Sequence, residues 1–135
     1  MQANYFRAPT NLDGFRGGDQ GIAQLNNEQA AANGDQTGAG GLRLDTGVGG
    51  NLTLVKGLAD DTVQPNDSSW FGYFKDGSNA PGDVVQMADA PWYTENWFGL
   101  QEMSAAGQLA FESVPGAHMQ FSTAELTALV QKYWG

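Results

Sequence analysis

The chain has 135 residues and a formal net charge of −9, and hydrophobic residues make up 41% of its composition. A chain of this length forms one ordinary domain, so two large independent domains are excluded, and its hydrophobic content excludes wholesale disorder. The 15 acidic and 6 basic residues include no cluster of Lys or Arg, so nucleic acid is a poor partner. Cysteine is absent and histidine occurs once, which excludes disulfides and thiolate zinc sites; we expect no metal and no cofactor.

Membrane and targeting signals are also missing from the sequence. No apolar stretch approaches the roughly 18 residues that a membrane span needs. The opening MQANYFRAPT lacks the basic start and the apolar run of a signal peptide. We therefore expect a soluble chain without a membrane span, and the compartment stays undecided at this point.

Residues 1–50 are polar and rich in glycine, with one short extended segment expected at 21–25. Seven of the eighteen residues at 33–50 are glycine, which predicts a loop because each glycine raises the backbone entropy lost on ordering. Neither glycine cluster completes a G-x-G-x-x-G or a G-x-x-x-x-G-K-[ST] pattern, so no nucleotide site is predicted.

Apolar runs predict the elements between residues 51 and 107. NLTLVKGL predicts a buried strand over 52–56, and the aromatic run at 70–74 predicts a strand or hairpin. Residues 94–103 suit about two helical turns, which Gly107 would end in a left-handed conformation.

The C-terminal stretch predicts a strand, a loop and a helix that form one closing unit. QLAFESV predicts a strand over 108–114, and Pro115 breaks it. Ser122 and Glu125 have the S-x-x-E spacing of a capping box, which predicts a helix start. An apolar stripe at i, i+3, i+4 and i+7 of that helix is expected to be buried: Leu126, Leu129, Val130 and Tyr133.

The acidic pair and the single histidine each follow a predicted strand. Asp60 and Asp61 come after strand 52–56, and His118 comes 58 residues after Asp60 (118 − 60 = 58), on the loop before the last helix. A lone histidine is more often structural, but loops mounted on a rigid scaffold carry function disproportionately. In α/β-hydrolases the acid and the histidine follow the nucleophile in this order, each after a strand.

A nucleophile is not found. G-x-S-x-G does not occur, and every serine lies downstream of Asp60, the wrong order for an α/β-hydrolase. Ser122 is better explained as a helix cap, and Ser68 and Ser69 as turn residues. Asp61 is interpreted as a solvated or capping residue.

Two blocks of sequence resemble a known family. Residues 54–74 contain D-D-T-V-Q-P with W-F-G, and residues 93–122 contain G-L-Q-E-M-S-A-A-G-Q-L followed by G-A-H. These blocks, with NYFRAP at 4–9 and AQLNNE at 23–28, resemble the carboxyl-terminal part of palmitoyl-protein thioesterases, α/β-hydrolases that remove fatty acyl groups from cysteine thiols. The resemblance spans nearly the whole chain but less than half of a complete family member.

The resemblance implies a fold and a catalytic pair. The fold would be the C-terminal part of an α/β-hydrolase, a mostly parallel sheet with a closing helix, incomplete on its own. Asp60 matches the triad acid and His118 the triad histidine, although Ala117 stands where the family usually has an acidic residue. Residues 1–50 would be the tail of an insertion and 51–135 the hydrolase portion. The family's serine and oxyanion donors have no counterpart here, so the chain alone is expected to be inactive.

The aromatic residues allow two interpretations. They could line a groove for a fatty-acyl ligand, since a fatty chain contributes about 0.8 kcal/mol per buried methylene. Packing in the core is the favoured interpretation for most of them. Three aromatics lie among polar residues and are expected to be exposed, so they are the candidates for binding substrate: Trp92, Trp97 and Phe98.

Two functions therefore remain open. The chain is a thioesterase-like hydrolase fragment, whose exposed sheet edge is covered by a second polypeptide or by a missing N-terminal half. Alternatively, it is a catalytically inert binding or structural subunit of a larger assembly. The resemblance also implies the secretory pathway or the lysosome, where the N-x-[ST] sites at Asn51 and Asn66 would make the chain a glycoprotein.

Overall fold

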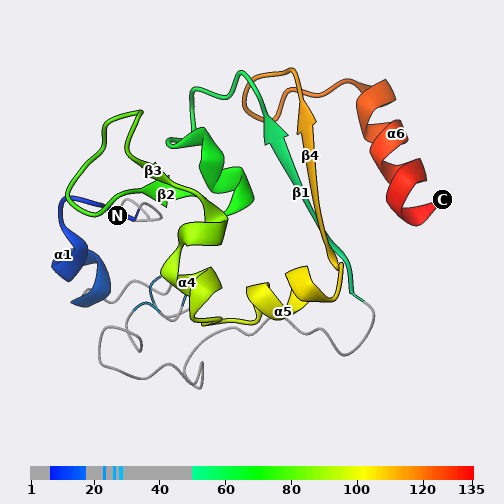
Figure 1. Ribbon diagram of the computed structural model, residues 1–135. Helices are drawn as coiled ribbons and strands as arrows, with labels where there is room; N and C mark the ends of the chain where they lie inside the picture. The colour runs from blue at the N-terminus through cyan, green and yellow to red at the C-terminus, as the bar shows by residue number, and fades with distance from the viewer. Residues whose placement is uncertain (1–6, 18–22, 24–25, 27, 29–49) are drawn as a thin grey trace.

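The structure is a computed structural model that describes residues 7–17, 23, 26, 28 and 50–135 (Figure 1). The expected loop at 33–50 and the extended segment at 21–25 lie outside the described residues, except for Gly50 and Ala23. In chain order the elements are α1 (Leu12–Gly17), β1 (Leu52–Gly57), the 3₁₀ helix η1 (Asn66–Trp70), β2 (Tyr73–Phe74), β3 (Val84–Val85), the 3₁₀ helix η2 (Met87–Asp89), α4 (Pro91–Thr94), α5 (Leu100–Ala105), β4 (Leu109–Val114) and α6 (Thr123–Trp134).

The two predicted long strands form a parallel pair. β1 pairs with β4 in a register that runs from Leu52 opposite Leu109 to Gly57 opposite Val114. Their carboxyl ends therefore lie at the same edge, and the loops that follow them lie side by side at the top of Figure 1. The strand predictions at 52–56 and 108–114 are confirmed, and so is the parallel arrangement.

The helix η1 covers one face of this sheet. The ring of Trp70 meets Phe111 edge to face, with 6.0 Å between ring centroids. Its Nε1 donates to the backbone oxygens of Leu54 at 3.2 Å and Glu112 at 3.3 Å, so one side chain bridges both strands. Trp70 therefore fixes η1, and the chain that leads into it, against the sheet.

The terminal helix α6 begins as the sequence predicts. The side chain of Ser122 accepts from the backbone N–H of Glu125 at 3.2 Å, and Glu125 Oε2 accepts from the backbone N–H of Ser122 at 2.7 Å. The last turn reaches the sheet, where Lys132 Nζ lies 2.6 Å from Glu112 Oε1 and the hydroxyl of Tyr133 donates to the same oxygen. The capping box is confirmed.

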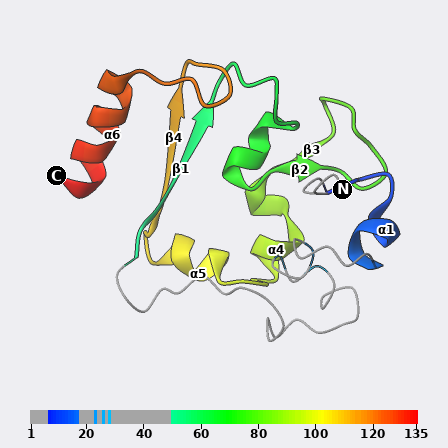
Figure 2. The ribbon, with the colours of Figure 1, turned by 180° about the vertical axis from the view of Figure 1, so that it is seen from behind.

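The expected buried stripe of α6 is wrong. Leu126 is 46% exposed and Val130 is 47% exposed, and Leu129 and Tyr133 are only half-buried. α6 lies beyond β4, away from α4 and α5, in both views of the chain (Figure 1, Figure 2). Periodicity shows which face of a helix is apolar, but burial also needs a neighbouring layer, and no element of the described residues covers this face.

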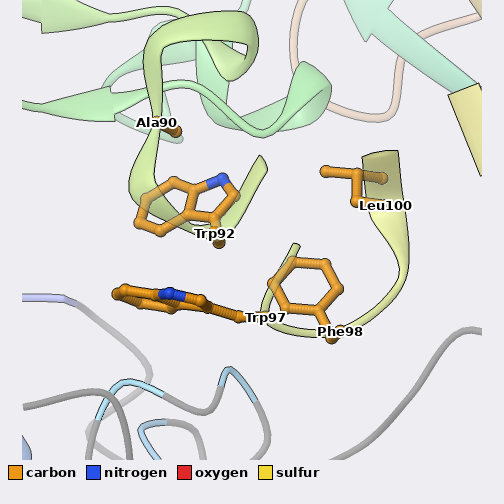
Figure 3. Close-up of a cluster of buried hydrophobic side chains, with 5 residues drawn as sticks. All are labelled: Ala90, Trp92, Trp97, Phe98 and Leu100. Carbon is orange, nitrogen blue, oxygen red and sulfur yellow. The ribbon is translucent and has the colours of Figure 1, made fainter. Parts of the chain in front are cut away.

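The hydrophobic core lies instead around α4 and α5 (Figure 3). The ring centroids of its two tryptophans are 6.4 Å apart. The buried cluster consists of Ala90, Trp92, Trp97, Phe98 and Leu100. The predicted helix over 94–103 is confirmed only in its second half, because α4 ends at Thr94 and α5 begins at Leu100. Asn96 and Gly99 between them have positive φ values of 53° and 89°, a left-handed conformation that no α-helix contains. The predicted stop at Gly107 is confirmed by its φ of 69°.

The hairpin expected at 70–74 is confirmed in part. β2 pairs with β3 antiparallel, with Tyr73 opposite Val85. Trp70 belongs to η1 instead, and Phe71 has a left-handed φ of 61°, so the extended backbone begins only at Tyr73. Among the described residues, no helix has both the length and the apolar character to cross a bilayer.

Candidate active site

The loops after β1 and β4 meet and bring Asp60 and His118 together. The first loop turns back at once, since the backbone N–H of Asp60 donates to Gly57 O at 3.1 Å. The backbone N–H of Ala59 donates to Gly116 O at 3.1 Å, which joins the two loops. His118 Nδ1 lies 2.8 Å from Asp60 Oδ2. The proximity expected from the sequence is therefore confirmed.

The carboxylate of Asp60 is held by its own loop. Its Oδ1 accepts from the backbone N–H groups of Thr62 at 2.9 Å and Val63 at 3.1 Å, which leaves Oδ2 for the imidazole. The hydrogen bond with His118, followed by these two backbone bonds, lowers the pKa of Asp60 below its ordinary value. The acid is therefore ionised at neutral pH and oriented toward the histidine.

This arrangement fixes the proton on the imidazole. An ionised carboxylate only accepts hydrogen bonds, so a neutral His118 donates from Nδ1 and keeps a free lone pair on Nε2. The side chain of Asp60 is 7% exposed, whereas that of His118 is 43% exposed. The pair therefore combines a carboxylate that is largely shielded from solvent with an imidazole that solvent can reach.

The other polar candidates are Asp61 and the serines at 68, 69 and 122. Asp61 is exposed, in agreement with its interpretation as a solvated residue. The hydroxyl of Ser122 donates to Glu125 Oε2 at 2.8 Å, in addition to its capping role, and Ser68 and Ser69 lie in η1. Among the described residues, no three His, Cys, Asp or Glu side chains group closely enough to hold a metal ion.

A cavity of about 240 Å³ lies beside the Asp60 loop. Its lining includes Val63, whose N–H binds the carboxylate of Asp60, together with residues of η1 and β2 and the aromatic side chains of Trp92 and Phe98. The expectation that the three candidate aromatics are exposed is wrong, since Trp92, Trp97 and Phe98 are 7%, 8% and 8% exposed. Trp92 and Phe98 line the cavity, whereas Trp97 packs in the core.

Arg7 contributes to this cavity, and the sequence did not indicate it. Its guanidinium forms ion pairs with Glu28 and Asp76 at 2.8 and 2.9 Å and lies over the ring of Tyr73, 4.6 Å from its centroid. Burial lowers the pKa of Arg7, but Glu28 and then Asp76 outweigh burial and raise it. The charged arginine thus links the N-terminal segment to the hairpin. A lone arginine in a polar stretch gives no sequence signal for this contact.

Comparison with known proteins identifies the family. The family model for palmitoyl protein thioesterase matches residues 1–118. Palmitoyl-protein thioesterase 1 of Caenorhabditis elegans is 31% identical over 135 residues, which cover 99% of this chain and 42% of the relative. Lysosomal thioesterase PPT2-B of Xenopus laevis is 31% identical over 112 residues, which cover 83% of this chain and 36% of the relative.

A fused relative shows the same pattern of coverage. The palmitoyl-protein thioesterase-dolichyl pyrophosphate phosphatase fusion 1 of Schizosaccharomyces pombe is 30% identical over 134 residues, 99% of this chain and 20% of that protein. The chain thus spans less than half the length of each of these relatives. The family has the α/β-hydrolase fold, in agreement with the parallel pair of β1 and β4 and the helices around it. The chain belongs to the palmitoyl-protein thioesterase family.

Proposed function

We propose that this chain supplies the acid and the histidine of a Ser-Asp-His triad that hydrolyses fatty-acyl thioesters on protein cysteines. The observation that carries the proposal is the 2.8 Å contact between Asp60 Oδ2 and His118 Nδ1, made by a histidine whose side chain is 43% exposed. Membership of the thioesterase family supports the substrate class.

In the proposed reaction, His118 Nε2 takes the proton of a serine hydroxyl as its oxygen attacks the thioester carbonyl. The imidazolium then returns a proton to the leaving thiol, and the same nitrogen activates water to hydrolyse the acyl-serine. Asp60 holds the tautomer with Nδ1 protonated and stabilises the cation without taking its proton. Both roles follow from one hydrogen bond between an ionised acid and an imidazole.

The serine and the oxyanion donors would come from polypeptide outside these 135 residues. The sequence has no G-x-S-x-G, and the chain covers only 42% of the Caenorhabditis elegans relative. Loss of one oxyanion donor costs about 3 kcal/mol of barrier, so the pair cannot catalyse the reaction efficiently without them. We expect the 135-residue chain alone to show no appreciable thioesterase activity.

Exposed apolar side chains support the proposal that further polypeptide covers the sheet and α6. Parallel sheets are ordinarily buried on both faces. Here Val55 on β1 is 39% exposed and Phe111 on β4 is 42% exposed, and Leu126 and Val130 of α6 are 46% and 47% exposed. In this account residues 1–50 form the tail of an insertion and 51–135 the hydrolase portion.

The cavity beside the loop that carries Asp60 is the proposed site for part of the acyl chain. Trp92 and Phe98 supply apolar walls, and each methylene buried there contributes about 0.8 kcal/mol. Trp97 lies outside the lining and is assigned to core packing.

The alternative is an inert binding or structural subunit, which the exposed apolar face of α6 also supports. The two are separated by isolating the chain from its source, identifying what is bound to it and measuring hydrolysis of a palmitoyl thioester. A companion polypeptide with G-x-S-x-G, and turnover that the 135-residue chain lacks, is the expected result. Unrelated companions in fixed stoichiometry without turnover would support the structural subunit.

The family also suggests a location. Relatives from frog, fly and mouse are named lysosomal thioesterases, and we propose the secretory route for this chain as well. Asn51 is exposed and suits glycosylation, whereas Asn66 Nδ2 donates to Gly57 O at 2.9 Å. Asn51 is therefore the favoured acceptor.

A further inference from the structure

Gly57, the last residue of β1, lies against the backbone of the histidine loop. A Cβ at this position would be 3.0 Å from Gly116 O and 3.1 Å from Ala117 O. Ordinary van der Waals contacts of a Cβ lie at 3.4–4 Å. A Cβ at position 57 would therefore fit only if the carbonyls or the strand end moved by a few tenths of an ångström.

These two carbonyls belong to the segment that places His118. Gly116 O accepts the backbone N–H of Ala59 at 3.1 Å, the bond that joins the two loops. Ala117 directly precedes His118, and its carbonyl accepts from Gln120 N at 3.0 Å. A displacement of either carbonyl is thus passed to the imidazole and changes its position relative to Asp60.

Hydrogen bonds hold the carboxyl end of β1 in place, so it has little room to move away from the histidine loop. Gly57 O accepts from Asp60 N at 3.1 Å and from Asn66 Nδ2 at 2.9 Å, and the Gly57 backbone is paired in register with Val114. Because the glycine is held on these sides, a side chain at residue 57 would push the histidine loop.

We propose that Gly57 is a positioning residue for the Asp60–His118 pair. Its missing side chain allows the histidine loop to approach the end of β1 closely enough for the 2.8 Å contact to form. The catalytic meaning of this role rests on the function proposed above, but the contact itself can be tested without turnover.

The test uses Gly57→Ala and Gly57→Val, with Gly82→Ala as the matched control. A Cβ at position 82 would have no heavy atom within 4 Å, so Gly82→Ala changes only the conformational freedom of the backbone. His118 is the chain's only histidine, so ¹⁵N-histidine labelling of this chain, alone or with an unlabelled companion, gives one set of imidazole signals. These signals distinguish protonation at Nδ1 from protonation at Nε2.

We expect the unchanged chain and Gly82→Ala to show the Nδ1-protonated tautomer with its N–H proton protected from exchange. Gly57→Ala should shift the two ¹⁵N signals toward an average of both tautomers and expose the proton, and Gly57→Val should do so further. Signals in Gly57→Val identical to those of the unchanged chain would overturn the proposal. If Gly57→Val does not fold, unchanged signals in Gly57→Ala would overturn it. If the unchanged chain shows the expected Nδ1-protonated signals but its assembly does not hydrolyse a palmitoyl thioester, the proposed function is contradicted and the role of Gly57 is not.

Discussion

Replacement of Asp60 by Asn should reverse the tautomer of the histidine while leaving the loop in place. In the structure, Oδ1 of Asp60 accepts from two backbone N–H groups, those of Thr62 and Val63, at 2.9 and 3.1 Å. In Asp60→Asn the amide oxygen must keep this position, because an NH₂ group there would face two donors. The NH₂ group then replaces Oδ2, 2.8 Å from His118 Nδ1.

An NH₂ group at that distance can only donate, so the imidazole must accept at Nδ1 and carry its proton on Nε2. In the proposed mechanism Nε2 takes the serine proton, and a proton already on Nε2 would block this step. The corresponding substitution in a Ser-His-Asp protease with intact geometry lowers kcat about 10⁴-fold, and we expect a loss of this order. The two loop bonds are retained, so the fold should be preserved.

The assay is hydrolysis of a palmitoyl thioester by the assembly that carries the nucleophile, with ¹⁵N spectra of His118 recorded on the same variant. Asp61→Asn is the matched control, because Asp61 is exposed and its carboxylate has no part in the pair. Activity in Asp60→Asn close to that of the control, or an imidazole still protonated at Nδ1, would refute the reasoning.

Three further outcomes follow from burial and charge. Trp97→Ala should lower the free energy of unfolding by about 3–5 kcal/mol, read from the urea midpoint, because Trp97 is 8% exposed, whereas Trp134→Ala at a 71% exposed side chain should change it by less than about 0.5 kcal/mol. Leu126→Asp should match Thr127→Asp in the stability of the chain alone but weaken binding of the companion polypeptide; equal binding would show that this face of α6 stays in water. Because the pKa of Asp60 is lowered, the stability that its ionised carboxylate contributes is complete above the ordinary pKa of 3.8 and is lost as the pH falls through the lowered pKa. The unfolding midpoints of the unchanged chain and of Asp60→Asn should therefore converge as the pH falls through that range. Midpoint curves that stay parallel would contradict the assignment.

Features that depend on neighbouring residues could be predicted from the sequence. The capping box of Ser122 and Glu125 and the left-handed stop at Gly107 each need only one turn of chain. Strands β1 and β4 were visible as apolar runs, and the family motifs then indicated Asp60 and His118 as a pair. All of these signals lie within short segments.

Features that depend on distant segments could not be predicted in the same way. The apolar pattern of α6 is genuine, yet Leu126 is 46% exposed, because a pattern does not supply the layer that would cover it. Trp97 lies among polar neighbours in the sequence but is buried by the left-handed turns around it, which bring α4 and α5 together. Arg7 and Glu28 are 21 residues apart, and their ion pair leaves no local trace.

Gly57 illustrates the same limit at the site itself. In the sequence it looks like an ordinary residue at the end of a strand, and neither its spacing nor its neighbours indicate a role. Its importance comes from two carbonyl oxygens about sixty residues later in the chain, 3.0 and 3.1 Å from where a Cβ would stand. Only the pairing of β1 with β4 brings these atoms together.

The most direct test of the central claim is the turnover of a palmitoyl thioester by the nucleophile-bearing assembly with His118→Gln. The neighbouring Met119→Gln is the control, since Met119 is 74% exposed and has no part in the proposed pair. General base catalysis by a positioned histidine contributes about 10²–10⁴-fold, so His118→Gln should lower kcat by at least about 10²-fold while Met119→Gln leaves it nearly unchanged. Equal turnover in the two variants would contradict the assignment of His118 as the base. It would also contradict the proposal that the contact between Asp60 and His118 serves catalysis.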